Sequence, residues 1–318
     1  MNDATAGERR RITLIGAPVD EGAGQSGCLM GPDALRVVGL AESLQDLGYD
    51  VADVGNLAPE RVSLDRAAGG RARHAEIIAG WTRAIARQVH DTLAEGAIPL
   101  VMGGDHSLAM GSVAGVARFW QGRDRPLFIL WLDAHADFNT PFTTPSGNMH
   151  GMPIAALTGE AELGWLFGDD GFTPLDPARF HLFGIRSIDR EERDLLVARG
   201  VSVNDMRRVD EFGVAVLMRE VIEAVAAQGG VLHVSLDVDF LDPGVAPGVG
   251  TTVPGGATWR EAHLIMEMLH DSGLVGSFDI VELNPILDER GRSARAMVEL
   301  AASLFGRQII ARPTRTQW

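Results

Sequence analysis

Cysteine is nearly absent from this chain: one residue, Cys28, occurs among 318. A single thiol excludes an internal disulfide and a zinc site built from cysteines, and it favours the reducing environment of the cytoplasm. Long apolar runs are absent too, since no stretch approaches the roughly 18 residues that span a bilayer. The sequence therefore predicts a cytoplasmic protein that does not enter membranes.

Basic side chains are the minority, with 28 Lys and Arg against 43 Asp and Glu and a net charge of −15. This balance argues against nucleic acid and anionic membranes as partners, and it favours cationic ligands by long-range attraction. Solubility alone would explain the excess acid equally well. We find no repeat, low-complexity tract or linker, and a length of 318 residues suits one large α/β domain or two ordinary ones.

Short β-branched runs alternate with longer segments of helical periodicity. The expected strands are 12–16, 98–102, 127–132, 180–185, 231–236 and 277–282. Apolar residues at helical spacing form three sets: Ile78, Trp81, Ile85, Val89 and Leu93; Ala262, Ile265, Met266 and Leu269; and Met297, Leu300, Ala301 and Leu304. Thr258 is expected to begin the second of these helices. This alternation predicts a parallel sheet with helices on both faces, and ligand sites at the carboxyl ends of its strands.

Two short segments place metal-ligating side chains directly after expected strands. Asp133-Ala-His135-Ala-Asp137 follows 127–132, and Asp237-Val-Asp239 comes at the end of 231–236. In an extended chain, side chains two residues apart point to the same face. Four carboxylates gathered in one place repel each other unless cations compensate them. Carboxylate and imidazole ligands in this number favour two ions of Mn, Fe, Co, Ni or Zn, and hence a two-metal hydrolase.

A further histidine follows another expected strand. In Gly103-Gly-Asp105-His106-Ser107 the two glycines are expected to let the chain turn sharply after 98–102 and bring His106 to the strand end. A strand-end histidine by itself is more often structural. Beside the acidic cluster, His106 is expected to be a metal ligand.

Two other patterns resemble known ligand-binding loops but lack residues or spacings that those loops require. The segment from Asp237 to Asp242 begins like a calcium loop, but Leu241, Asp242 and Gly248 stand where oxygen, glycine and glutamate are needed. Asp242 is instead expected to be a turn residue. Gly22-Ala-Gly24-Gln-Ser-Gly27 matches G-x-G-x-x-G, but five residues separate it from any helix start, so no dinucleotide site is expected.

Taken together, these residues resemble the ureohydrolase family, and arginases most closely, from about Ile12 to Phe305. The resemblance is carried by Gly103–Ser107, by Asp133–Asp137 and by Ser235-Leu-Asp-Val-Asp-Phe-Leu-Asp-Pro243. The loop Asn139–Pro153 resembles the amino-acid-binding loop of arginases. The resemblance implies a single domain over residues 1–318, a three-layer αβα sandwich around a mainly parallel eight-stranded sheet, and a homo-oligomer (trimer or hexamer). Residues 1–10 and 309–318 are expected to be weakly ordered.

The resemblance also implies two Mn²⁺ ions per chain, although Co²⁺ and Ni²⁺ fit the same ligands. The first ion would be held by His106, Asp133, Asp137 and Asp237. The second would be held by His135, Asp133, Asp237 and Asp239, so that Asp133 and Asp237 bridge the two.

The implied reaction is hydrolysis of L-arginine to L-ornithine and urea by a hydroxide shared between the metals. Asp137 would pass a proton to the departing amine, His150 would exchange protons with water, and Glu282 would bind the guanidinium. Asn139, Thr144 and Ser146 match positions that bind the α-carboxylate of arginine. Asp189 and Glu192 match positions near its α-amino group, although a solvated helix face would also explain this charged run.

Three departures from the family pattern bear on these expectations. Thr252 stands where proline is frequent and Phe240 where glycine is frequent, so both are expected to alter packing beside the metals. Ser187 stands where many relatives have an acid, which weakens the α-amino assignment and so the choice of arginine over other guanidino acids. The nearest alternative is a ureohydrolase acting on agmatine or guanidinobutyrate. A single-zinc deacetylase and a non-catalytic binding protein of the same fold are further alternatives, but the full set of six metal ligands disfavours both.

Overall fold

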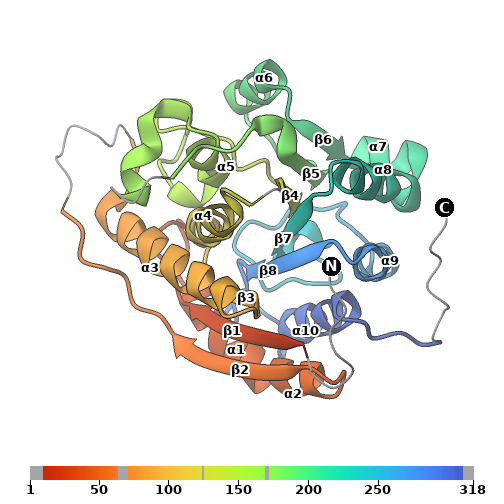
Figure 1. The fold of residues 1–318 in the computed structure, drawn as a ribbon. Coiled ribbons are helices and arrows are strands. Elements are labelled where there is room, and N and C mark those ends of the chain that lie inside the picture. The colour runs from red at the N-terminus through yellow and green to blue at the C-terminus, as the bar shows by residue number, and fades with distance from the viewer. Residues whose placement is uncertain (1–9, 64–70, 124, 169–171, 311–318) are drawn as a thin grey trace.

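A parallel sheet forms the centre of the computed structural model, which describes residues 10–63, 71–123, 125–168 and 172–310. Within these residues the sheet has eight strands in the order β2-β1-β3-β8-β7-β4-β5-β6 (Figure 1). Every strand pair is parallel, so the predicted αβα architecture is confirmed. The strands are β1 (Arg11–Ala17), β2 (Asp50–Asn56), β3 (Ile98–Gly103), β4 (Leu127–Leu132), β5 (Phe180–Ile185), β6 (Ser202–Asp205), β7 (Val231–Asp237) and β8 (Val275–Val281).

Helices cover both faces of this sheet. The α-helices of the described residues are α1 (Gly31–Val37), α2 (Leu40–Gln45), α3 (Ala75–Ala94), α4 (Ala109–Trp120), α5 (Pro153–Leu157), α6 (Arg190–Arg199), α7 (Met206–Phe212), α8 (Val214–Ala227), α9 (Trp259–Ser272) and α10 (Arg292–Leu304). The three periodic segments expected as helices correspond to α3, α9 and α10. Thr258 caps α9 as expected, because its hydroxyl accepts from the backbone N–H of Glu261.

Two hydrophobic cores result, one on each face of the sheet. In β4, Phe128 and Leu130 enter the core formed with α1, α2, α8, α9 and α10, whereas Ile129 and Trp131 enter the core formed with α3, α4 and α5. Figure 1 shows α3 and α4 on the opposite side of the sheet from α8, α9 and α10. Since both faces of the central strands are buried, these strands do not alternate apolar and polar residues. The strand β4 is a continuous apolar run, whereas β7 and β8 also carry buried polar residues, among them His233 and Asp279.

The two edge strands were not expected from the sequence. Residues of β2 are exposed or half-buried along their whole length, and β6 has only four residues. An edge strand pairs on one side only and needs no apolar face, so neither segment carries the apolar run by which the other six were recognised. The expectations for residues 1–10 and 309–318 fall almost entirely outside the described residues.

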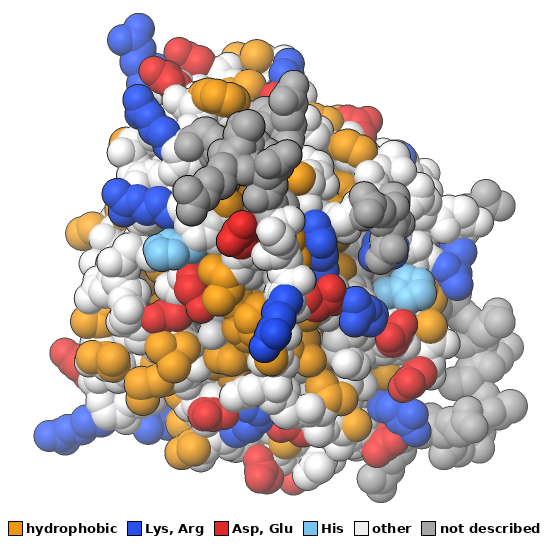
Figure 2. Space-filling model, turned by 90° about the vertical axis from the view of Figure 1, so that its left-hand side faces the viewer, with side chains coloured by type: hydrophobic (Ala, Val, Ile, Leu, Met, Phe, Trp, Pro, Cys, Tyr) orange, Lys and Arg blue, Asp and Glu red, His pale blue; other side chains and the backbone are white. Residues whose placement is uncertain are grey.

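The helices and the surface bear on membranes and on charge. None of the helices in the described ranges is long and apolar enough to cross a bilayer. Figure 2 shows the face that lies to the left in Figure 1, where acidic and basic side chains intermingle around a group of hydrophobic ones. The excess negative charge is therefore not gathered into one patch on this face.

The four central strands bring the sequence motifs together. The strands β3, β8, β7 and β4 are neighbours and run in parallel, so their carboxyl ends lie at one edge of the sheet. His106 follows β3, Asp133 follows β4, Asp237 is the last residue of β7, and Glu282 follows β8. The topology therefore converts four segments that are distant in the sequence into one site.

Candidate active site

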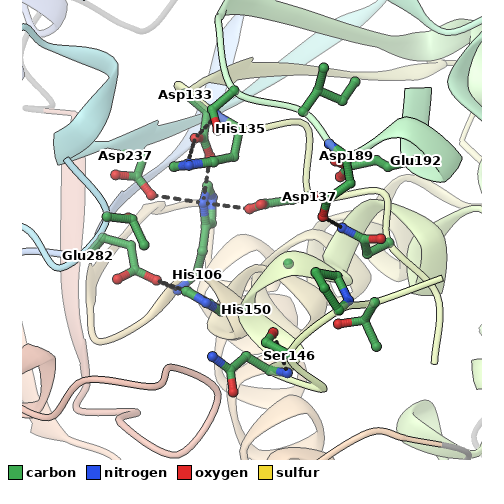
Figure 3. Close-up of a pocket in the computed structure, with 18 residues that line it drawn as sticks. His106, Asp133, His135, Asp137, Ser146, His150, Asp189, Glu192, Asp237 and Glu282 are labelled. Atoms are coloured by element: carbon green, nitrogen blue, oxygen red, sulfur yellow. Dashed lines mark hydrogen bonds and ion pairs between the residues drawn. The ribbon is translucent and has the colours of Figure 1, made fainter. Parts of the chain in front are cut away.

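His106 lies at the centre of this site, surrounded by three carboxylates (Figure 3). Its Nδ1 atom is 3.0 Å from Asp133 Oδ2, 3.1 Å from Asp137 Oδ2 and 3.2 Å from Asp237 Oδ2. These side chains are at most 9% exposed. A nitrogen facing three carboxylate oxygens from two strand ends has the donor set of a divalent cation site.

A second group of ligands shares Asp133 with the first. His135 Nδ1 is 3.0 Å from Asp239 Oδ2 and 3.6 Å from Asp133 Oδ1. Asp133 thus directs one carboxylate oxygen toward His106 and the other toward His135. Two groups with a common carboxylate are what two bridged ions require. Asp237 contacts His106, a member of the first group. That Asp237 also binds the second ion, and so bridges the two, stays a prediction.

The electrostatics of the cluster call for added positive charge. Burial alone would lower the pKa of His106, but the nearby carboxylates of Asp133, Asp137 and Asp237 raise it well above its ordinary value. His135 behaves in the same way, and its pKa rises to about 12. Burial and the charge of Asp133 raise the pKa of Asp137 to about 6. His106 Nδ1 is buried and has no hydrogen-bond partner among the described residues. These residues therefore fit a pair of divalent cations.

The glycines before His106 act differently from the expectation. Neither Gly103 nor Gly104 has a positive φ. A Cβ on Gly103 would lie 2.7 Å from the carbonyl oxygen of Ile280, and one on Gly104 would lie 2.4 Å from the backbone nitrogen of Val19. Both glycines are required because neighbouring backbone approaches them closely, and no unusual turn is involved.

Three side chains that the motifs did not indicate fix the ligands in place. Trp131 stacks on the His106 ring at 4.0 Å and donates to Asp133 Oδ2 at 3.0 Å. Ser235 Oγ lies 2.9 Å from His106 Nε2, which leaves Nδ1 for the carboxylates. Thr251 donates to Asp239 Oδ2 at 2.9 Å. Such contacts hold a ligand in its binding orientation and tune its basicity. Trp131 looks like an ordinary core residue of a strand. Ser235 belongs to a motif that carries the family resemblance, but the sequence assigns it no contact.

Arg186 is a further residue that sequence reasoning missed. Its guanidinium donates to five backbone carbonyls, including that of Asp239 at 2.6 Å and that of Val253 at 2.7 Å. It thereby joins the end of β5 to the turn that carries Asp239. Burial lowers the pKa of Arg186, but guanidinium remains charged in proteins. Asp242 is a turn residue, as expected, and accepts from the backbone N–H groups of Gly244 and Gly255.

Replacing Arg186 with lysine is expected to weaken metal binding by about 10- to 100-fold, as loss of an outer contact to a ligand does in other metal sites. An ammonium cannot reproduce a planar fork that reaches five carbonyls at once. Calorimetric titration of the metal-free protein with Mn²⁺ would measure the change. Arg207→Lys, which alters an exposed pair with Glu211, is the matched control. Equal affinity in the two variants would contradict the assignment.

Glu282 and His150 lie together at one end of the pocket. His150 Nδ1 is 2.9 Å from Glu282 Oε1, which also accepts from the backbone N–H of His106 at 2.8 Å. Burial alone would lower the pKa of His150, but Glu282 raises it to about 9. Glu282 and Asp137 have φ values of 63° and 48°, a left-handed conformation that is costly for residues with a side chain. An ordinary strand-end carboxylate would need no such backbone.

The residues matched to the amino-acid end of arginine line the same pocket. Asp189 and Glu192 lie across it from Glu282 and His150 (Figure 3). Asn139 Nδ2 donates to Asp189 Oδ2 at 3.0 Å. Glu192 is only 4% exposed and accepts from the N–H of Phe138 at 2.8 Å, so a solvated helix face is the wrong description of this residue. The remaining pocket residues expected at this end are Thr144 and Ser146.

The departures from the family pattern are found beside the same pocket. Ser187 lines it together with Asp189. Phe240 is buried, and a Cβ on Gly184 would lie 2.6 Å from its ring. The phenyl group thus packs directly against β5. Nothing in the structure assigns a function to Thr252.

The sequence and the fold are similar to those of known proteins along nearly the whole chain. A family model described as the Arginase family matches residues 10–306. The chain belongs to the arginase family. Arginase of Brucella melitensis is 51% identical over 306 residues, which are 95% of this chain and 98% of that protein. Arginase of Agrobacterium fabrum is 48% identical over 311 residues, 96% of this chain and 94% of that protein.

Solved structures of arginases have the same fold as this chain. The native arginase of Bacillus caldovelox matches with a TM-score of 0.87 and 40% identity, and the match covers 95% of this chain and 100% of that one. Membership of the arginase family confirms the resemblance drawn from the three motifs, and it identifies the chain as a hydrolase.

Proposed function

We propose that this chain hydrolyses L-arginine to L-ornithine and urea with two divalent metal ions. Relatives named arginase at 51% and 48% identity support the reaction. The observation that carries the metal requirement is Asp133, whose two carboxylate oxygens face His106 and His135 separately. We propose two Mn²⁺ ions, although Co²⁺ and Ni²⁺ fit the same ligands.

In this proposal one ion is held by His106, Asp133, Asp137 and Asp237, and the other by His135, Asp133, Asp237 and Asp239. Two bound divalent ions would lower the pKa of a water molecule enough to supply hydroxide near neutral pH. The four carboxylates leave the loaded cluster without excess positive charge. A guanidinium cation can therefore approach it.

Three side chains of the pocket act on the substrate. Glu282 binds the guanidinium by charge-assisted hydrogen bonds and sets its plane. Asp137 passes a proton to the departing amine nitrogen, and its position at one end of the ligand group, 3.1 Å from His106 Nδ1, supports this role. His150 exchanges protons between the pocket and water, and its 18% exposure allows this.

The opposite end of the pocket selects an amino acid. Asn139, Thr144 and Ser146 would bind the α-carboxylate, and Asp189 and Glu192 would face the α-amino group. A site whose polar groups are left unpaired by an analogue rejects that analogue. Agmatine, which lacks the carboxylate, is therefore expected to be a poor substrate.

Urea release from L-arginine, agmatine and 4-guanidinobutyrate, measured with protein preincubated with Mn²⁺, tests the proposal. Arginine is expected to react at least about 100-fold faster than either analogue, as for sites that lose paired polar groups. The Asp137→Asn variant should abolish all release. Preference for agmatine or guanidinobutyrate would overturn the specificity, and no urea from any substrate would favour a non-catalytic binding protein.

The proposal extends to the assembly and location of the protein. We propose a single domain that assembles into a trimer or hexamer in the cytoplasm. Sedimentation velocity of the metal-loaded protein would measure the assembly, and a monomer at micromolar concentration would contradict it.

A further inference from the structure

The segment around Cys28 packs unusually closely on the chain that follows β8. The carbonyl oxygen of Ser26 accepts from Asn284 Nδ2 at 3.1 Å. A Cβ on Gly27 would lie 2.2 Å from Asn284 Oδ1, and one on Gly31 would lie 3.0 Å from the carbonyl oxygen of Leu283. Two glycines therefore allow this approach on either side of Cys28. The side chain between them is brought against Glu282.

The thiol of Cys28 lies in contact with the Glu282 carboxylate. Its Sγ atom is 3.5 Å from Glu282 Oε2, and the residue is 1% exposed. Burial, followed by the charge of Glu282, raises the pKa of the thiol far above its ordinary value, so the sulfur keeps its proton. A carboxylate can only accept, and the thiol must therefore be the donor.

The two oxygens of Glu282 have different surroundings. Oε1 accepts from the backbone N–H of His106 and lies 2.9 Å from His150 Nδ1. The donor that the described residues bring to Oε2 is Cys28. A thiol is a weak donor with one hydrogen, so it occupies part of the accepting capacity of Oε2 and leaves the rest. Oε2 is thus the oxygen best able to accept from a cationic ligand.

We propose that Cys28 is a positioning residue for Glu282: its S–H group holds Oε2 and so fixes the plane in which the carboxylate meets the guanidinium. The effect on the reaction rests on the proposed role of Glu282. The contact itself does not. Contact and consequence can therefore be tested separately.

The contact is tested by infrared spectroscopy of the metal-loaded protein. Cys28 is the one cysteine of the chain, so a single S–H stretching band is expected, and Cys28→Val must remove it. Hydrogen bonding to a carboxylate should place this band at a lower wavenumber than that of an unbonded thiol. Glu282→Gln, with a weaker neutral acceptor, should move it higher. A band that does not respond to Glu282→Gln would overturn the proposal.

The consequence is tested by steady-state kinetics with L-arginine. Cys28→Val, which keeps a buried side chain of similar size, is expected to lower kcat/KM about tenfold, the scale of one hydrogen bond to a charged group with a weak donor. Most of the change should appear in KM, since Glu282 contacts the substrate before and during the reaction. Cys28→Ser, which retains a donor, should lose less than Cys28→Val.

The outcomes separate the two proposals. If the unmodified protein releases no urea from arginine, the proposed function fails, and the S–H band still decides whether the contact exists. If that protein is active and Cys28→Val matches it in KM and kcat, the positioning role is overturned alone. Equal losses in Cys28→Ser and Cys28→Val, with unchanged metal content, would overturn the donor role of the thiol.

Discussion

Replacing Asp133 with asparagine is expected to reduce urea release by at least about a thousandfold, which corresponds to the several kcal/mol of transition-state stabilisation that metal ions contribute. Asp133 is the one acid common to both ligand groups of the described residues, with an oxygen facing each histidine. A carboxamide removes its charge and replaces one of these oxygens by a donor. Both ions should therefore bind more weakly. Metal content after gel filtration and the initial rate with arginine would measure the two effects.

The matched control for this variant is Asp205→Asn. Asp205 caps the start of α7 and accepts from the backbone N–H of Arg208, a contact that asparagine makes equally well. The Asp205→Asn variant should therefore retain its metal ions and its activity. An Asp133→Asn protein with two tightly bound ions and a rate within tenfold of the original would show that Asp133 does not bridge.

Removing the metal ions with a chelator is expected to lower the midpoint of thermal unfolding by about 10 °C near pH 8. Two sites filled at about 100 times their dissociation constants stabilise the fold by about 5 kcal/mol in total, and 1 kcal/mol shifts the midpoint of a large domain by about 2 °C. Four carboxylates that are almost fully buried make the loss larger than for a surface site. Differential scanning calorimetry, with Mn²⁺ added back as the control, would measure it.

The same difference should shrink at about pH 5, because protons substitute for the metal ions. The pKa of Asp137 in the folded protein is about 6, above the ordinary value of about 4. A folded-state pKa raised in this way stabilises the metal-free protein below about pH 4, and the contribution is lost as the pH rises through about 6. The loaded protein does not share this loss. A difference that stays constant between these pH values would show that the cluster does not exchange protons for metal.

Much of the fold could be predicted because a doubly covered sheet leaves a strong signal. Six strands are rich in apolar residues, since both of their faces are buried. The edge strands β2 and β6 leave no such signal.

In the candidate site, too, some residues could be predicted from the sequence and others could not. His106 and the acids Asp133 and Asp237 could be recognised because each follows or ends an expected strand, and parallel strands bring such residues together at one edge of the sheet. The contacts of Arg186, Ser235 and Cys28 could not be predicted, because each of them joins residues more than 50 positions apart. Such contacts exist only once the sheet has formed, and a single sequence carries no mark of them.

The left-handed backbone at Asp137 and Glu282 has a consequence for protein engineering. Substitutions that relieve an unfavourable φ are among the standard ways to raise thermal stability, and they would introduce glycine or asparagine at these two positions. Either change would delete a carboxylate that the proposed reaction uses. Thermal stability and activity therefore make opposite demands at these two residues. At each of them an unfavourable backbone conformation directs a carboxylate into the pocket.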